Sequence, residues 1–227
     1  MAAQFAYTKL GAETAAVLYD VGSDYSSWLA QYFIDAFEDI GGTIVGKEAF
    51  RSGELDYRAM LQELKQEDPD VIFIPTAQKE AALAMKQARD LDYKGTFLGG
   101  DNWGSPDTVS LGGEAVEGGY FVNLASLEDP DIQDFIKEYK AAYSSDPVLP
   151  NPVMAIDALI VLVEAIKKAD STDGDKIAQA IEEIKDLQAL TGKITFDPET
   201  HNPLNKPAII QQNKDGEFIF VEKYVTN

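Results

Sequence analysis

The stretch that decides the fold is residues 68–104, which read DPDVIFIPTAQKEAALAMKQARDLDYKGTFLGGDNWG. Residues 71–74 are apolar and partly β-branched, which is typical of a strand buried on both faces. A helical pattern with Ala82 and Met85 in register follows, and a second apolar run at 96–98 ends in a glycine-rich loop. Strand, helix and strand within this length predict a βαβ unit with a right-handed crossover.

Both strands of this unit run in the same direction, so the loops that follow them leave the sheet at one edge. We expect loops 75–78 and 99–104 to emerge side by side. In open parallel sheets, ligands bind at the carboxyl ends of the strands. We therefore expect Asp101 and its neighbours to form half of a small-molecule cleft.

The composition excludes several classes of protein. The 227 residues suit one large or two small domains, and no apolar run approaches the ~20 residues that span a bilayer. With 39 acidic and 19 basic residues the net charge is -20, which repels phosphate backbones and argues against nucleic acid and anionic membranes as partners. The absence of cysteine excludes thiol catalysis, disulfides and cysteine-ligated metals.

The residues before this stretch continue the same alternation of strands and helices. We expect a strand at 15–19, a helix at 27–40 that ends at two glycines, a strand at 43–45 and a helix at 55–65. A short helical turn at 105–111 and a strand at 119–123 follow the stretch. This order predicts an α/β fold, a doubly wound parallel sheet covered on both faces.

After residue 126 the alternation ends. We expect three helices and then three strands, at residues 131–143, 152–169, 175–186, 193–196, 208–210 and 217–225. The middle helix has Asn151 as its expected N-cap and Pro152 at its first position. Its residues are apolar nearly all round, which predicts a helix buried on most sides. Residues 213–216 predict a hairpin turn between the last two strands.

The sequence offers little for catalysis or metal binding. His201 is the only histidine and lies in a polar loop between prolines, which favours a surface residue over a member of a Ser-His-Asp site. A metal site rich in His or Cys has no ligands to draw on. We therefore predict no enzymatic activity, no catalytic residue, no cofactor and no metal.

Three further motifs have plainer interpretations. The glycine-rich residues 41–46 lie after a helix and before a strand, which reverses the order of a dinucleotide-binding loop. Residues 211–222 have calcium-loop spacing, but Gln211 stands where an Asp is expected, so a β-hairpin is favoured. Asp20 ends the first strand, yet the clustered acids that a phospho-accepting Asp requires are missing around it.

Two loops at the same edge of the expected sheet form the strongest candidate site. One carries Asp24 and Tyr25, and the other carries Asp101, Asn102 and Trp103. Asp and Asn are also common turn residues, and aromatic residues beside glycines often only cover a sheet. On spacing alone, a ligand site and an ordinary pair of turns both remain open.

At these loops the sequence resembles the type I periplasmic binding proteins of ABC transporters, in the branched-chain amino acid (leucine/isoleucine/valine) branch. The resemblance covers nearly the whole chain in the family's order. The matching stretches are AAVLYDVGSDYSSWLAQYFIDAFEDIGGTIVGKEAF, SGELDYRAMLQELKQEDPDVIFIPTAQKEAALAMKQARDLDYKGTFLGGDNWG, GEAVEGGYFVN and GKITFDPETHNPLNKPAIIQQNKDGEF.

The resemblance implies two α/β lobes joined by three crossings that close over a ligand. It places residues 1–125 in the second lobe, the helical residues 126–190 in an incomplete first lobe, and residues 191–227 back towards the second lobe. Residues 1–4 lack the basic start of a signal peptide. The opening βα units that the family places at the start of the first lobe are also missing, so we expect a fragment that begins mid-protein. The resemblance implies a periplasmic or extracellular location, either free or as a membrane-anchored lipoprotein.

The resemblance also implies a set of ligand-binding residues, namely Tyr25, Asp101, Thr76, Ala77, Gln78 and Trp103. Tyr25 matches the family's aromatic contact, and Asp101 matches the acidic residue that binds the ligand ammonium. Ala77 is small where the family often has a large side chain facing the ligand. Trp103 would line the same wall by stacking or a cation–π contact.

The implied function is solute binding and delivery of an amino acid or similar solute to a membrane permease. The helix at 152–169 would pack on a first-lobe sheet that this chain does not contain, so we expect self-association or repacking through it. A second hypothesis is the sensor domain of a receptor or regulator with the same fold. A third, an enzyme of doubly wound fold, is disfavoured because the chain lacks a phosphate loop and a cysteine.

Overall fold

The structure, a computed structural model, describes residues 1–204 and 206–225. It divides into two compact units. The sheet unit comprises Met1–Asn123 and Ile209–Tyr224, and the helical unit comprises the described residues of Leu124–Ala208 with Val225. The expected part 191–227 is therefore shared between the units, and its residues 205 and 226–227 lie outside the described residues. That the two units are ligand-binding lobes remains a prediction.

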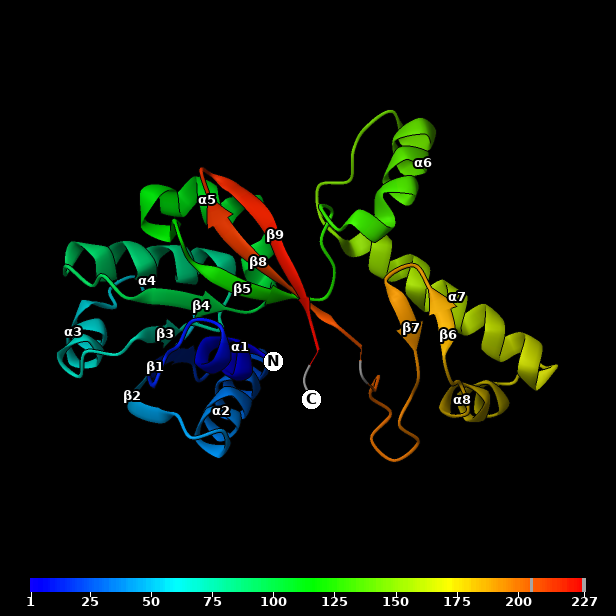
Figure 1. Cartoon of the computed structure of the whole chain (residues 1–227), viewed down its shortest axis with the longest axis horizontal. Helices are drawn as coiled ribbons and strands as arrows, with labels where there is room; N and C mark the ends of the chain where they lie inside the picture. The colour runs from blue at the N-terminus through cyan, green and yellow to red at the C-terminus, as the bar shows by residue number, and fades with distance from the viewer. Residues whose placement is uncertain (205, 226–227) are drawn as a thin grey trace. The chain divides into compact units, whose positions relative to one another are not determined.

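The sheet unit contains a seven-stranded sheet in the order β2-β1-β3-β4-β5-β8-β9 (Figure 1). The first five strands are parallel to their neighbours, and β8 joins antiparallel to β5. The predicted doubly wound α/β fold is confirmed, with an antiparallel hairpin added at one side. The strands are β1 (Thr14–Asp20), β2 (Thr43–Phe50), β3 (Val71–Phe73), β4 (Thr96–Gly99), β5 (Tyr120–Asn123), β8 (Ala208–Lys214) and β9 (Glu217–Tyr224).

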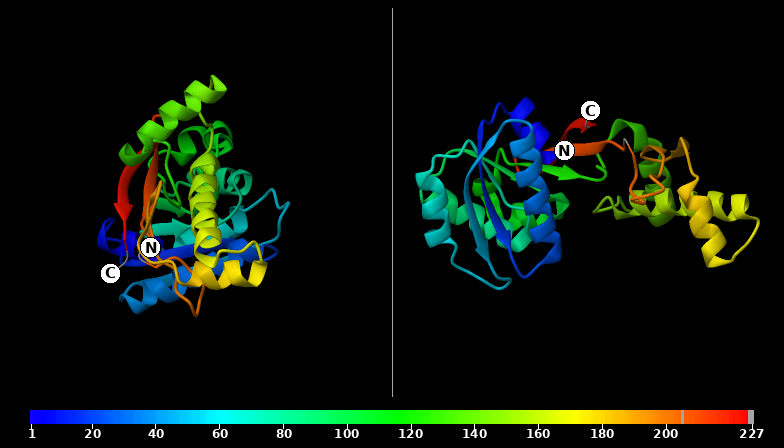
Figure 2. Two further views of the ribbon diagram at one scale, coloured as in Figure 1. Left: turned by 90° about the vertical axis from the view of Figure 1, so that its right-hand side faces the viewer. Right: turned by 90° about the horizontal axis from the view of Figure 1, so that it is seen from below.

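Helices cover both faces of this sheet (Figures 1 and 2). Helices α1 and α2 pack on one face, where Phe5, Phe33 and Phe37 are buried. Helices α3 and α4, with the segment after α5, pack on the other face. Their bounds are α1 (Ala2–Thr8), α2 (Asp24–Asp39), α3 (Arg58–Gln66), α4 (Gln78–Asp90) and α5 (Pro106–Gly112), with short 3-10 turns at η1 (Asp101–Gly104) and η2 (Gly113–Val116).

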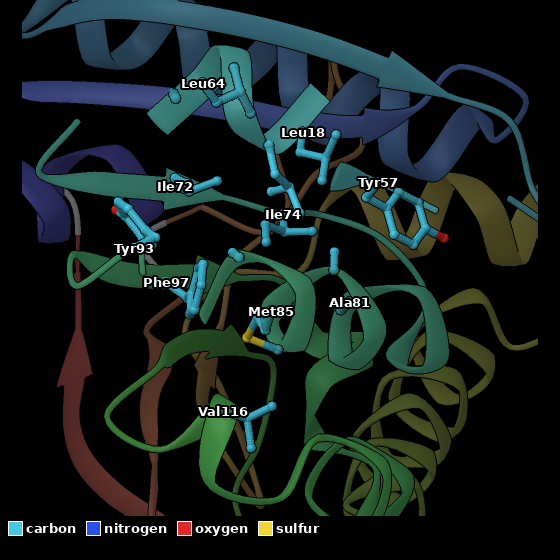
Figure 3. Close-up of a cluster of buried hydrophobic side chains, with 14 of the residues drawn as sticks. Leu18, Tyr57, Leu64, Ile72, Ile74, Ala81, Met85, Tyr93, Phe97 and Val116 are labelled. Atoms are coloured by element: carbon cyan, nitrogen blue, oxygen red, sulfur yellow. The ribbon is translucent and has the colours of Figure 1, made fainter. Parts of the chain in front are cut away.

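The core on the α4 face follows from the apolar runs of the sequence (Figure 3). Leu18, Ile72 and Ile74 from the sheet side meet Ala81 and Met85 from α4, and all five are fully buried. Burial of a large apolar side chain contributes about 1.5–3 kcal/mol to stability. This packing fixes α4 against β3 and β4, and so places the loops at their carboxyl ends.

Helix α3 begins at Arg58, so the prediction that it begins at residue 55 is wrong. Leu55 is 73% exposed, whereas Tyr57 is fully buried. The Gln87 side chain holds the segment before the helix: its Oε1 accepts from Tyr57 N at 2.6 Å, and its Nε2 donates to Leu55 O at 2.8 Å. The second bond occupies the Leu55 carbonyl, which a helix beginning at residue 55 would use as an intrahelical acceptor.

Helix α2 begins at Asp24, three residues before the predicted start. Ser23 is its N-cap, and the Ser23 hydroxyl accepts a hydrogen bond from Ser26 N at 3.3 Å. Tyr25 therefore lies in the first turn of a helix and not in a free loop. Strand β2 is longer than predicted and continues to Phe50, because it pairs with β1 along the whole length of that strand.

The helical unit contains three α-helices and a two-stranded hairpin among its described residues. Its elements are η3 (Pro130–Ile132), α6 (Gln133–Tyr143), α7 (Asn151–Ala169), α8 (Gly174–Glu182), β6 (Leu187–Ala189) and β7 (Gly192–Ile194). The predicted Asn151 N-cap is wrong, because Asn151 is already helical and Pro150 occupies the cap position. Helix α8 ends at Glu182 and not at residue 186, because Asp186 has a positive φ of 52° and its N donates to Thr195 Oγ1 at 2.9 Å.

Helix α7 is buried along one stripe only, which corrects the prediction of burial on most sides. The buried positions recur every four residues, at Val153, Asp157, Val161 and Ala165. On the opposite side Leu159, Leu162 and Val163 are 52%, 43% and 40% exposed. The apolar residues of α7 thus exceed what the helical unit covers.

The β8–β9 hairpin has the predicted turn, with positive φ at Asp215 (54°) and Gly216 (78°). The Glu117 carboxylate accepts hydrogen bonds from both turn amides, at 2.8 and 2.9 Å. Residues 211–222 are thus a hairpin and not a calcium loop. Within residues 1–204 and 206–225, no group of three or more acidic or histidine side chains is placed to hold a metal ion.

None of the described helices is long and apolar enough to cross a membrane.

Candidate functional site

The candidate site lies at the carboxyl edge of β1, β3 and β4 in the sheet unit. The strand order 2-1-3-4-5 places the change in winding direction between β1 and β3, where doubly wound proteins bind ligands. Tyr25 follows β1, residues 76–78 follow β3, and Asp101 follows β4. The parallel pairing of β1 with β3 and of β3 with β4 brings these three segments to one edge, as the sequence predicts.

Tyr25 and Asp101 are in direct contact at this edge. The Tyr25 hydroxyl donates a hydrogen bond to Asp101 Oδ1 at 2.6 Å, and both side chains are half-buried. No hydrogen bond from another described residue reaches Asp101 Oδ2, and none of the described lysines or arginines forms an ion pair with Asp101. One carboxylate oxygen is therefore fixed by the protein and the other is available to a ligand.

Burial raises the pKa of Tyr25 well above its usual range, and the hydrogen bond to Asp101 and the charge of Asp101 raise it further. A backbone hydrogen bond from Asn102 acts in the opposite direction. At neutral pH the Tyr25 phenol is thus a neutral donor. It orients the carboxylate but does not cancel its charge, so the pair suits a ligand with a cationic donor group.

A network around Asp20 fixes the loop that leads to Tyr25. The buried Asp20 carboxylate accepts from Gly22 N at 2.8 Å, from Ser52 N at 3.1 Å and from the Ser52 hydroxyl. In return, Asp20 N donates to Ser26 Oγ at 2.9 Å. These bonds tie the β1–α2 loop to the segment after β2. Asp20 is therefore structural, and sequence reasoning that looked for chemistry at this position missed its role.

Trp103 does not lie at the surface of the site, which corrects the prediction that it lines the wall. Its indole is fully buried, and its Nε1 donates to Ile74 O at 3.1 Å. The ring packs against Gly99, where even a Cβ atom would lie 2.2 Å from it. Trp103 therefore belongs to the core that supports the edge, and its stacking on a ligand is not retained.

The segment after β3 has one buried, one exposed and one half-buried side chain. Thr76 is 3% exposed, Ala77 is exposed, and Gln78 is half-buried at the start of α4. The backbone turns sharply here, with Thr76 N donating to Ile74 O at 2.9 Å. The small Ala77 side chain is thus presented at the same edge as Tyr25 and Asp101, and the ligand roles of these three residues remain predictions.

His201 lies outside this site, in the helical unit. Its side chain is 67% exposed, and its Nε2 lies 3.2 Å from Glu182 Oε1. Like Asp215, it has a positive φ, here 59°. The structure therefore agrees with the interpretation of His201 as a surface residue.

Comparison with known proteins gives the chain its relatives. The periplasmic binding protein family matches residues 1–217. A Pseudomonas aeruginosa leucine-, isoleucine-, valine-, threonine-, and alanine-binding protein is 27% identical over 206 residues, which cover 87% of this chain and 52% of that protein. The Rhizobium johnstonii Leu/Ile/Val-binding protein BraC3 is 27% identical over 86% of this chain and 53% of its own.

Solved structures with a similar fold are proteins of the same kind. A leucine-binding protein from Thermotoga maritima is 34% identical with a TM-score of 0.86, and the match covers 99% of this chain and 63% of that one. The branched-chain amino acid transporter substrate-binding protein of Streptococcus pneumoniae, solved with isoleucine, is 25% identical with a TM-score of 0.81 at the same coverage. The chain spans about half the length of the curated relatives that it matches. Because the family matches nearly the whole chain, the chain belongs to the periplasmic binding protein family, a family of solute-binding proteins and not of enzymes.

Proposed function

We propose that this protein is the solute-binding component of an ABC transporter and that it binds an amino acid at the edge formed by Tyr25 and Asp101. Family membership and the names of its relatives, which bind leucine, isoleucine and valine, support the proposal. The 34% identity to the Thermotoga maritima leucine-binding protein supports it further.

The observation that carries the proposal is the hydrogen bond from Tyr25 to one oxygen of Asp101. It leaves Asp101 Oδ2 free to accept from an α-ammonium group. A charge-assisted bond of this kind contributes about 1.5–3 kcal/mol. Because the carboxylate is half-buried at a strand end, its bond to the ligand competes less with water than a fully exposed one would.

The proposed ligand class is the aliphatic amino acids. Ala77 follows β3 and Asp101 follows β4, and these two strands are paired, so the exposed Ala77 lies at the same edge as the carboxylate. A large side chain at residue 77 would fill space that an alanine leaves to the ligand. Thr76 and Gln78 flank this position, and we place them in the same site.

A solute-binding protein of this family works outside the cytoplasm, and its macromolecular partner is the membrane permease of the transporter. We propose both for this chain, in the periplasm or at the cell exterior. The proposal needs no cofactor and no metal, since binding rests on hydrogen bonds and apolar contacts alone.

The test is a tryptophan-fluorescence titration with a panel of L-leucine, D-leucine, L-isoleucine, L-valine, L-alanine, L-phenylalanine and acetamide. It is carried out on this chain and on a fusion that adds the part of the Thermotoga maritima relative that the match does not cover. Trp28 is 61% exposed on α2, one turn after Tyr25, and serves as the reporter. Saturable binding of an aliphatic L-amino acid, and none of D-leucine, supports the proposal. Silence of both proteins across the panel contradicts it.

We also propose that copies of this chain associate through the exposed side of α7. Leu159, Leu162 and Val163 form its centre. Leu162 also lines a groove of about 310 Å³, together with Met154 and Phe196. Large exposed apolar patches are rare on monomeric proteins, which supports a covered state for this surface.

A further inference from the structure

Gly100 stands directly before Asp101, at the point where β4 gives way to η1. Its backbone angles are φ -100° and ψ -175°, an extended conformation that any residue adopts. The backbone at residue 100 therefore does not require glycine. The reason for a glycine here must lie in what a side chain would touch.

A side chain at residue 100 would collide with the Tyr25 hydroxyl. A Cβ atom built there lies 2.5 Å from Tyr25 Oη, which is closer than real Cβ contacts come. The next neighbours are Leu29 Cδ1 at 3.3 Å and Tyr25 Cζ at 3.6 Å, of which the first is tight and the second ordinary. The hydroxyl is the single atom within 3 Å, and it is the atom that donates to Asp101.

We propose that Gly100 is a positioning residue for the site: its missing Cβ is the space in which the Tyr25 hydroxyl sits while it holds Asp101. Any larger residue at this position moves the phenol away from the carboxylate and frees both Asp101 oxygens to turn. The consequence of this movement for ligand affinity rests on the proposed function. The geometric dependence of the Tyr25–Asp101 bond on Gly100 does not.

The preceding residue, Gly99, makes room for a different side chain, so the contact with Tyr25 is specific to Gly100. A Cβ atom at Gly99 would overlap the buried ring of Trp103, with contacts of 2.2 and 2.3 Å. Gly99 therefore seats a core side chain, and Gly100 seats a side chain of the site. The two adjacent glycines cannot be distinguished in the sequence, but one makes room for a core residue and the other for a residue of the candidate site.

The test is a double-mutant cycle with Gly100→Ala and Tyr25→Phe, in which the melting temperature of each variant is measured by thermal unfolding. Phenylalanine removes the colliding oxygen and leaves ring carbons at ordinary distance. In the wild-type background we expect Gly100→Ala to lower the melting temperature by about 3–8 °C. In the Tyr25→Phe background the same change should be neutral or slightly stabilising, because alanine restricts the unfolded chain more than glycine does.

Gly174→Ala is the matched control. A Cβ atom at residue 174 meets nothing within 4 Å, and its φ is not positive. Its effect should be the same in the wild-type and Tyr25→Phe backgrounds. If Gly100→Ala lowers the melting temperature equally in both backgrounds, Leu29 or the backbone is the obstacle and the inference is overturned.

The binding arm uses L-leucine on the wild type and on the same variants. We expect Gly100→Ala to weaken leucine binding about tenfold or more, and to add no further loss once Tyr25→Phe is present. A Gly100→Ala variant that binds leucine as the wild type does overturns the positioning role. If neither the wild-type chain nor its fusion binds an amino acid, the proposed function fails, and the unfolding cycle alone still decides the dependence of Tyr25 on Gly100.

Discussion

The Tyr25 hydroxyl donates a hydrogen bond of 2.6 Å to Asp101 Oδ1, joining residues 76 positions apart in the sequence. Tyr25 lies in the first turn of α2, which follows β1, and Asp101 is the first residue of η1, which follows β4. The bond therefore links the ends of β1 and β4. Because β3 lies between these strands, the pair crosses the place where the winding of the sheet changes direction. The contact between these side chains therefore joins the two strand ends at the centre of the proposed site.

Asp20→Ala should destabilise the protein by about 2–4 kcal/mol, because it leaves the amides of Gly22 and Ser52 without their acceptor. The measurement is urea unfolding followed by circular dichroism. Asp39→Ala, at an exposed position near the end of α2, is the control and should change stability little. An Asp20→Ala variant as stable as the control would show that the carboxylate is not a structural tie.

In the helical unit, Asp157→Ala should reduce stability by about 3–5 kcal/mol. The Asp157 carboxylate is buried and accepts from Leu190 N at 2.7 Å, from the amide and hydroxyl of Thr191, and from Lys206 Nζ at 3.0 Å. Lys206→Met should reduce it less, because the backbone donors remain. Both are measured by urea unfolding, with the exposed Glu164→Ala on the same helix as control. Equal effects of Asp157→Ala and Glu164→Ala would contradict this account.

Alkaline pH should destabilise the sheet unit. Burial raises the pKa values of Tyr25, Tyr57 and Tyr93 in the folded state above the usual value of 10.0. Below about pH 10 the tyrosines are neutral in both states, and the stability of the fold is fully present. Above about pH 10 the unfolded state ionises first, so the fold loses stability as the pH rises. For Tyr93 the loss is at most about 1.4 kcal/mol per pH unit.

Urea midpoints measured from about pH 8 to about pH 11 test this. Tyr93→Phe should make the alkaline loss smaller, whereas Tyr32→Phe should leave it unchanged, since the Tyr32 side chain is 65% exposed. An alkaline loss that both variants share equally with the wild type would mean that the buried phenols do not cause it.

Replacing Leu162 with Glu should reduce self-association, because it places a charge in the exposed apolar face of α7. Light scattering over a wide range of protein concentration is the measurement. Leu55→Glu, at a leucine that is 73% exposed in the sheet unit, is the matched control and should leave association as it is. A wild-type chain that stays monomeric throughout, with α7 well ordered, would contradict association through this face.

The sequence was sufficient to predict the sheet and the neighbourhood of Tyr25 and Asp101. Apolar runs separated by helical patterns require parallel strands, and parallel strands bring their carboxyl ends to one edge. The pairing of β1 with β3 and of β3 with β4 follows that logic. Tyr25 and Asp101 could thus be placed together although nothing local connects them.

The place of Trp103 could not be predicted, because an aromatic residue beside glycines reads the same whether its ring points inwards or outwards. The ring is buried since Gly99 has no side chain to exclude it. The start of α3 depends in the same way on a distant residue, Gln87, which binds the backbone at 55 and 57. Strand β6 has three residues, too few for a periodic pattern.

The exposed side of α7 is a second feature that the sequence could not predict. A helix that is apolar nearly all round predicts partners on most sides. The helical unit supplies partners for one stripe, which includes Val161 and Ala165, and leaves Leu159 more than half exposed. The sequence of the helix shows how much apolar surface it has, but only the structure shows how much of that surface is buried within this chain.

The measurement that tests the central claim most directly is calorimetric titration of L-leucine and L-isoleucine into the wild type, Asp101→Ala and Asp107→Ala. Asp107 is an exposed acid on the neighbouring α5 and is the matched control. The account predicts that Asp101→Ala weakens binding by about tenfold or more with little change in melting temperature, and that Asp107→Ala binds as the wild type does. Undiminished binding by Asp101→Ala would contradict the account. So would a large loss of stability, because it would make Asp101 a structural cap.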